Sequence, residues 1–270
     1  MPETGLTLTL FLIGLIGAFF SGLLGLGGAI ILVPLLLYAP PLIGVGELTM
    51  KQVSGITIIV VFASALTGVL THNKNRLVSK SLVLIMGGTA ALAALLGSVY
   101  SKQTSSETLL VIFALMAAFA AVIMWLPKQE LGEDVLPEDI SFSKVGAFAI
   151  SLVVGFIGGM VGAPGAYIFA PLMIYFLGIP TKIAIGSTLG IAFAASIFGA
   201  IGKLVTGQVP YILTLAVLVG AVPGARIGAK YTKKIQAASL KKGLGVVIAF
   251  AAIRMCLDVA HKLKLFYRVA

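Results

Sequence analysis

Charged residues are scarce in this sequence. They make up 10% of the 270 residues, against about 25% in an ordinary soluble domain, whereas hydrophobic residues make up 59%. A soluble protein needs more charge to cover its surface, so a soluble globular fold is excluded. The apolar runs approach the ~20 residues that cross a bilayer, and they are continuous instead of alternating with period two. The sequence therefore predicts an all-α, polytopic transmembrane protein.

Cysteine and histidine are almost absent. The chain has one cysteine, Cys256, and two histidines, His72 and His261. An internal disulfide and a clustered metal site are therefore excluded. Walker A, GxSxG and HExxH patterns are missing as well, so no nucleotide site, serine nucleophile or zinc protease is predicted. We expect no cofactor, no metal and no enzymatic activity.

Acidic residues are also few, and none lies in the middle of an apolar run. All nine fall in the termini, in loops or near helix ends. An intramembrane aspartyl protease or a carboxylate proton relay is therefore not expected. The net charge of +10 fits the basic loops of membrane proteins and gives no reason to expect a nucleic-acid partner. The expected partners are a small anionic substrate, the lipid bilayer and, as an open alternative, a second copy of the chain.

A polar stretch divides the chain into two similar parts. We predict a first transmembrane repeat at 1–126, a polar linker loop at 127–143 and a second repeat at 144–270. FFSGLLGLGGAIILVPLLLY (19–38) aligns with FIGGMVGAPGAYIFAPLMIY (156–175), and the two segments share glycine and proline positions. Shared positions of these two residue types are unlikely to arise by chance between apolar segments.

Basic residues indicate how the two repeats are oriented. The loop at 72–80 is basic and its counterpart at 203–210 carries only Lys203, whereas in the next pair 230–242 is basic and 101–106 carries only Lys102. This exchange predicts inverted repeats with about eight to ten membrane segments. The basic residues after position 261 oppose this orientation. Lys203 aligns with His72, and both are predicted to lie at the membrane interface.

Glycines interrupt the apolar segments 6–45 and 144–178 near their middles. Matching interruptions in two halves are the best sequence indication of a transporter's binding site, and helices that restart there attract anions. The glycines predicted to bind substrate are Gly25, Gly27, Gly28, Gly162 and Gly165. Close helix packing is the alternative, and it is preferred for Gly220, Gly224 and Gly228.

Several polar residues near these segments are further candidates for substrate binding. Their hydroxyls can donate to an oxyanion or can bond back to the helix carbonyl four residues earlier, and the sequence does not decide between the two. The candidates are Ser54, Thr57, Ser187 and Thr188. Arg226, near the end of its span, either contacts substrate or extends to the interface.

The sequence resembles the TauE/SafE family of membrane permeases. The resemblance lies in GLLGLGGAIILVPLLL, in GGMVGAPGAYIFAPLMIY and in AIGST at 184–188, and it covers nearly the whole chain. It implies a multi-pass protein of the cell (plasma) membrane that exports small sulfur-containing oxyanions such as sulfite or organosulfonates. Without a carboxylate relay, we expect the membrane potential to drive export. An importer of another small anion or solute and a non-transporting accessory protein are the alternatives.

Overall fold

The computed structural model describes residues 2–24, 28–72, 78–125, 137–138, 140–232, 246 and 249–258. These ranges are mostly helical and contain no strand, so the all-α prediction is confirmed for them. Five helices among them are long and apolar enough to cross a membrane: Lys80–Tyr100, Ser106–Ile123, Lys144–Val161, Ile183–Val205 and Tyr211–Gly228.

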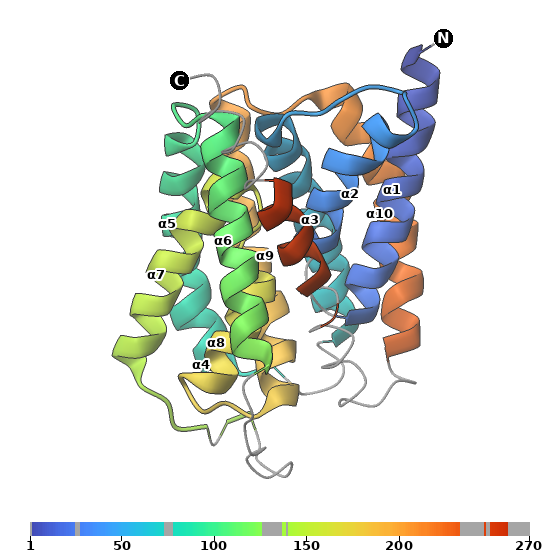
Figure 1. The fold of residues 1–270 in the computed structure, drawn as a ribbon. Coiled ribbons are helices and arrows are strands. Elements are labelled where there is room, and N and C mark those ends of the chain that lie inside the picture. Colours follow the sequence, from blue (N-terminus) through green and yellow to red (C-terminus); the bar gives the residue numbers. More distant parts are fainter. Residues whose placement is uncertain are drawn as a thin grey trace.

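The helices form one bundle (Figure 1). In chain order they are α1 (Pro2–Leu24), α2 (Ala29–Leu42), α3 (Met50–His72), α4 (Lys80–Leu82), the π-helical turn η2 (Val83–Gly87), α5 (Gly88–Tyr100), α6 (Ser106–Trp125), α7 (Lys144–Val161), α8 (Ala166–Tyr175), α9 (Thr181–Val205) and α10 (Tyr211–Thr232). Residues 249–258 are also helical.

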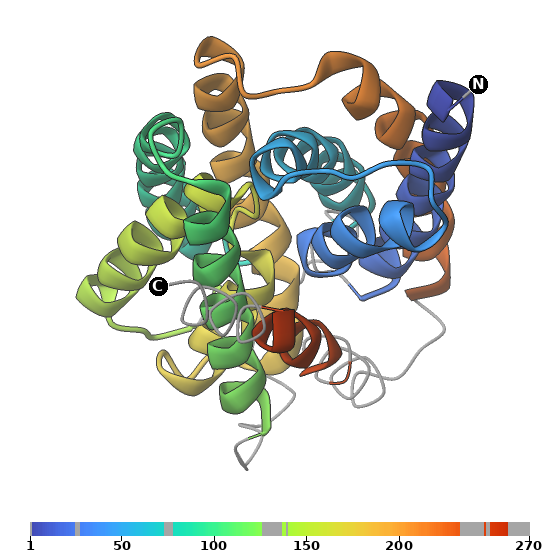
Figure 2. The same cartoon turned by 45° about the horizontal axis from the view of Figure 1, so that its top comes forward.

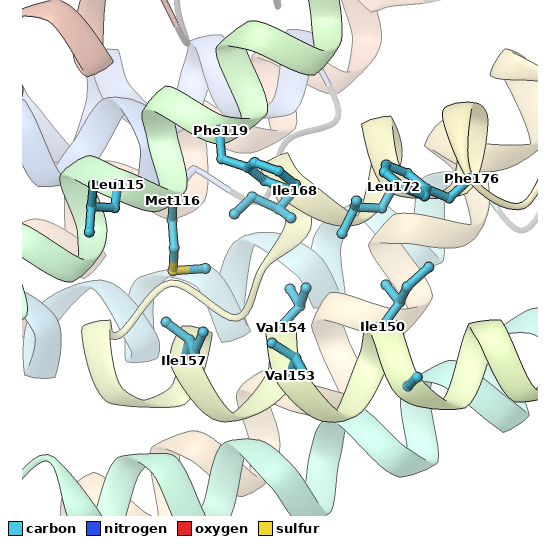
Figure 3. Close-up of a pocket in the computed structure, with 11 residues that line it drawn as sticks. Leu115, Met116, Phe119, Ile150, Val153, Val154, Ile157, Ile168, Leu172 and Phe176 are labelled. Carbon is cyan, nitrogen blue, oxygen red and sulfur yellow. The ribbon is translucent and has the colours of Figure 1, made fainter.

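The two glycine-interrupted segments are helical hairpins. After the break that follows α7, α8 turns back along α7, so that Val154 of α7 and Leu172 of α8 line the same groove (Figure 3). In the same way α2 returns beside α1, where Gly17 lies against Leu32. The helix α1 ends at Leu24 and α2 begins at Ala29, and α7 ends at Val161 and α8 begins at Ala166, so the predicted interruptions after α1 and α7 are confirmed. Pro34 lies inside α2, which continues past it, so this proline does not interrupt the helix.

Helices of the two predicted repeats are interleaved. From the first repeat, α1 packs along α10 of the second, and α5 packs along α7 of the second, on opposite sides of the bundle in Figure 1. Glycines make these contacts close: Gly220 of α10 lies against the Phe11 carbonyl and Gly224 against the Leu15 carbonyl. The packing role predicted for Gly220 and Gly224 is confirmed.

The helices α3 and α9 form the centre of the bundle and run antiparallel (Figures 1 and 2). Ile58 of α3 lies against Gly199 of α9, and the ring of Phe62 stacks on Phe193 with centroids 5.7 Å apart. Phe62 and Phe193 occupy equivalent positions of the two repeats. Equivalent residues meet in this way when a twofold pseudo-axis in the membrane plane relates two repeats. The contact supports the predicted inversion, which stays a prediction.

The glycine contacts between α1 and α10 lead to a stability prediction. An added methyl group at Gly220 would overlap the Phe11 carbonyl, whereas exposed Gly88 has nothing within 4 Å of such a group. Overpacking costs about 1–3 kcal/mol, and alanine otherwise favours a helix over glycine by about 0.5–1 kcal/mol. We expect Gly220→Ala to lower the unfolding temperature in detergent by about 5 °C and Gly88→Ala to leave it unchanged or higher. Equal unfolding temperatures for the two variants would contradict the packing.

Candidate functional site

One lysine is fully buried near the end of α9. The side chain of Lys203 is 0% exposed. Four oxygens lie within hydrogen-bond distance of its Nζ atom: Ser101 Oγ at 2.7 Å, Ser54 Oγ at 2.9 Å, Gln208 Oε1 at 3.0 Å and the Met160 carbonyl at 3.1 Å. The prediction that Lys203 lies at the membrane interface is therefore wrong. The face of α9 that carries this residue packs against α3 and α5, so the side chain points into the bundle.

The hydrogen bonds around Nζ favour a charged ammonium group. The Ser54 hydroxyl donates to the Lys51 carbonyl at 2.8 Å, and the Ser101 hydroxyl lies 2.6 Å from the Ser98 carbonyl. Each serine therefore turns a lone pair toward Nζ, and carbonyl oxygens have no proton to give. A neutral amine has only two protons for these acceptors, whereas an ammonium group has three.

The residues around Lys203 come from both predicted repeats. Ser54 lies in the second turn of α3, Ser101 follows the last residue of α5, and Met160 is the next-to-last residue of α7. The C-terminal ends of α5, α7 and α9 thus meet at one cation. The negative ends of helix dipoles stabilise a positive charge placed there.

The charge of Lys203 is not neutralised by its partners. All four are uncharged oxygens, and among the described residues Lys203 forms no salt bridge. A buried charge without a counter-charge is costly, because uncharged dipoles replace only part of its hydration. The positive charge that remains would attract an anion placed nearby. The cluster therefore suits an anionic ligand.

The break between α7 and α8 adjoins this cluster. Gly162 ends α7 with φ of 71°, and Gly165 begins α8 with φ of 80°, both in the left-handed region. Gly162 packs so closely on the Ser54 backbone that an added Cβ would overlap the Ser54 carbonyl. The structure thus brings together predicted site residues Ser54 and Gly162, with Gly165 at the same break.

The predicted threonines bond to their own helices. Thr57 Oγ1 donates to the Val53 carbonyl at 2.8 Å, and Thr188 Oγ1 donates to the Ala184 carbonyl at 2.7 Å. In this arrangement the hydroxyl protons of both threonines are donated to their own helices and not to a substrate, which is the second of the two possibilities that the sequence left open. Thr188 also lies about 22 Å along α9 from Lys203, at 1.5 Å per residue.

The remaining predicted residues lie away from Lys203 or outside the described residues. Ser187 is buried near the start of α9 and accepts from the Ser79 backbone N–H at 3.0 Å. Gly28 is buried and begins α2 with φ of 88°, and the side chain of Arg226 is exposed on α10. Gly25 and Gly27 lie outside the described residues. These positions stay predictions for substrate contact.

Two pockets elsewhere suit other ligands better than an oxyanion. The groove in Figure 3 has a volume of 480 Å³ and only apolar lining residues, including exposed Phe119 and Phe176, and offers no polar side chain to an anion. The other, of 390 Å³, is lined by Glu47, Glu107 and Asp258, and their carboxylates would repel an anion.

The chain matches the family model described as sulfite exporter TauE/SafE over residues 10–255. This match covers most of the chain, including both hairpins and the Lys203 cluster. The chain belongs to the TauE/SafE family. The resemblance seen in the glycine segments is confirmed, and with the five apolar helices it makes the protein a membrane transporter.

Curated relatives agree with this assignment. A Bacillus subtilis (strain 168) protein named "Probable membrane transporter protein YunE" is 25% identical over 88% of this chain and 93% of its own length. A "Probable membrane transporter protein" of Xylella fastidiosa (strain 9a5c) is 28% identical over 89% of this chain and 90% of its own. A protein of the same name from Haemophilus influenzae is 25% identical over 91% and 96%. No solved structure matches the chain. The relatives are thus named as transporters and not as enzymes.

Three polar residues around this site in the TauE/SafE protein were not predicted from sequence to belong to it: Lys203, Ser101 and Gln208. They lie at helix ends or, for Gln208, in the turn after α9, where polar residues are ordinary and where hydropathy gives no sign of burial. The sequence did contain one signal for Lys203. It is the single basic residue of its loop, whereas the counterpart loop in the other repeat carries several. The positive-inside bias does not explain a lysine on this side of the membrane, so its presence indicates another role.

Proposed function

We propose that this protein exports small sulfur-containing oxyanions, such as sulfite or organosulfonates, as a multi-pass transporter of the plasma membrane. The observation that carries the proposal is the buried Lys203 ammonium, whose four partners are all neutral oxygens. The family description supplies the sulfur-containing class of substrate. A sulfonate or sulfite has several acceptor oxygens, which suit the ammonium and the backbone N–H groups at the start of α8.

Alternating access follows from the proposed inversion of the two repeats. The Lys203 cluster joins α3 and α5 of one repeat to α7 and α9 of the other, so any relative movement of these four helices must rearrange it. Substrate sites of such transporters lie where inverted repeats meet, beside discontinuous helices. The antiparallel pair α3 and α9 and the break at Gly162 support this arrangement.

The membrane potential supplies the driving force in this proposal. Moving one negative charge outward gains about 2.3 kcal/mol per 100 mV when the interior is negative. Export of an anion therefore needs no carboxylate proton relay. The acidic side chains Glu47, Glu107 and Asp258 line a pocket with the ends of α2 and α6 and are not partners of Lys203.

A vesicle assay tests substrate class and driving force together. The protein, reconstituted in sealed vesicles, is loaded with sulfite, sulfoacetate, sulfate or thiosulfate, and efflux is measured at fixed pH with and without an imposed potential. We expect efflux of at least one of these anions above that of protein-free vesicles, faster by several-fold at about 100 mV, negative inside. Flux of neutral solutes alone would contradict the anion, and flux indifferent to potential would contradict the driving force.

A further inference from the structure

The oxygens around Lys203 Nζ form a shell that also fits a free monovalent cation. They stand between 2.7 Å, for Ser101 Oγ, and 3.1 Å, for the Met160 carbonyl. The shell has two hydroxyls, one backbone carbonyl and one amide carbonyl, the last from Gln208. Hard cations without strong geometric demands bind to such neutral oxygens, as K⁺ does to the carbonyls of channel filters.

The shell also lies where transporters with broken helices bind a coupling cation. In those proteins the C-terminal ends of half-helices and unwound backbone carbonyls coordinate the ion. Here the Met160 carbonyl belongs to the last turn of α7, directly before the break at Gly162. An amino group tethered to α9 occupies the position that a free ion would take.

The shell is held in place by bonds that do not involve the lysine. The Ser54 hydroxyl is held by the Lys51 carbonyl at 2.8 Å. The Gln208 amide donates to Thr206 Oγ1 at 2.6 Å and to the Ser98 carbonyl at 3.0 Å, which turns Oε1 toward the cation. Loss of the Lys203 side chain would therefore leave the oxygens oriented around an empty space.

We propose that Lys203 is a tethered replacement for a coupling cation. The protein consequently needs neither Na⁺ nor K⁺, and removal of the Lys203 side chain creates a site for a free monovalent cation. The role of this charge in flux rests on the anion transport proposed above, whereas the cation site itself rests only on the oxygen shell. In Lys203→Ala, a free cation would restore the missing positive charge, and anion flux would become cation-dependent.

Cation binding is tested by thermal unfolding in detergent. Wild type and Lys203→Ala are compared in ammonium, methylammonium, potassium, sodium and choline chloride at equal ionic strength. We expect ammonium or potassium to raise the unfolding temperature of Lys203→Ala by about 4 °C over choline at tenfold the dissociation constant, and to leave wild type unchanged. The double variant Lys203→Ala with Gln208→Leu, which lacks one shell oxygen, should lose most of this shift.

Several results would overturn the proposal. One is an unfolding temperature of Lys203→Ala that is the same in all five salts, and another is a shift that survives Gln208→Leu. If the alanine variant does not fold, Lys203→Ser serves in its place, and wild-type flux gives a separate test. Wild-type flux that requires Na⁺ or K⁺ over choline would also overturn the proposal. The unfolding temperature measures cation binding without any transport. A failure of the proposed anion transport can therefore be distinguished from a failure of the proposed cation site.

Discussion

Replacement of Lys203 by methionine is expected to lower anion flux about 100-fold or more. Methionine keeps most of the length of the apolar stem and removes only the charge. Loss of one partner from a buried ion pair costs about 3–5 kcal/mol, and 1.4 kcal/mol corresponds to a factor of ten. If Lys203 supplies the positive charge for the anion, the bound complex loses this amount.

The same substitution is expected to leave the unfolding temperature unchanged or to raise it. Lys203 carries a buried charge without a counter-charge, and apolar replacements of buried ionic groups are often neutral or stabilising. The substitution removes the contacts of Nζ with four oxygens whatever the role of Lys203, and these contacts join three helices and the turn after α9. Flux per folded molecule, and not the sign of the change in stability, therefore separates a substrate contact from a purely structural lysine.

The measurement combines efflux from vesicles with thermal unfolding in detergent. Lys80→Met is the matched control, because Lys80 is an exposed lysine at the start of α4 and the substitution removes the same charge. Its flux should stay within about twofold of wild type, as surface substitutions usually change stability by no more than ±0.5 kcal/mol. Folded Lys203→Met with normal flux would rule out Lys203 as the substrate's cation.

Much of the architecture could be predicted from sequence, because its causes are local. Long apolar runs give spans wherever they occur. The glycine breaks were also predictable, since Gly28 and Gly165 begin their helices with positive φ, which other residues rarely adopt. The duplication of these breaks then indicated where two helices are interrupted.

Hydropathy could not predict the centre of the candidate site, because its cause is tertiary. A lysine near a helix end lies at the membrane interface in one packing and in the bundle in another, and hydropathy is the same in both. What buries Lys203 is the contact of α9 with α3 and α5, where Gly202 of α9 faces the Ser98 side chain. The packing of α1 on α10 and of α5 on α7 joins the two repeats, so it could likewise not be predicted from the sequence of either repeat alone. Thr57 and Thr188 differ from Lys203, because the sequence already allowed both possibilities for their hydroxyls: donation to a substrate and donation to the helix carbonyl four residues earlier.

Gly162→Ala is expected to damage stability and transport together. Gly162 has a φ of 71°, and an alanine in this left-handed region costs about 1–2 kcal/mol. The added methyl group would also overlap the Ser54 carbonyl, and such overpacking costs about 1–3 kcal/mol more. Together about 3 kcal/mol should lower the unfolding temperature by roughly 9 °C. Movement of Ser54 would draw its hydroxyl from Lys203 Nζ, so flux per folded molecule should also fall.

Gly44→Ala separates backbone strain from the contact with Ser54. Gly44 has nearly the same φ, 69°, but is exposed in the turn after α2, and nothing lies within 4 Å of an added methyl group. Its substitution should therefore cost only the strain of about 1–2 kcal/mol and leave flux per folded molecule intact. If the two variants showed equal unfolding temperatures and equal flux, the close approach of the α7–α8 break to Ser54 would have no part in transport. A larger loss of both in Gly162→Ala would mean that the helix break, Ser54 and Lys203 act as one unit.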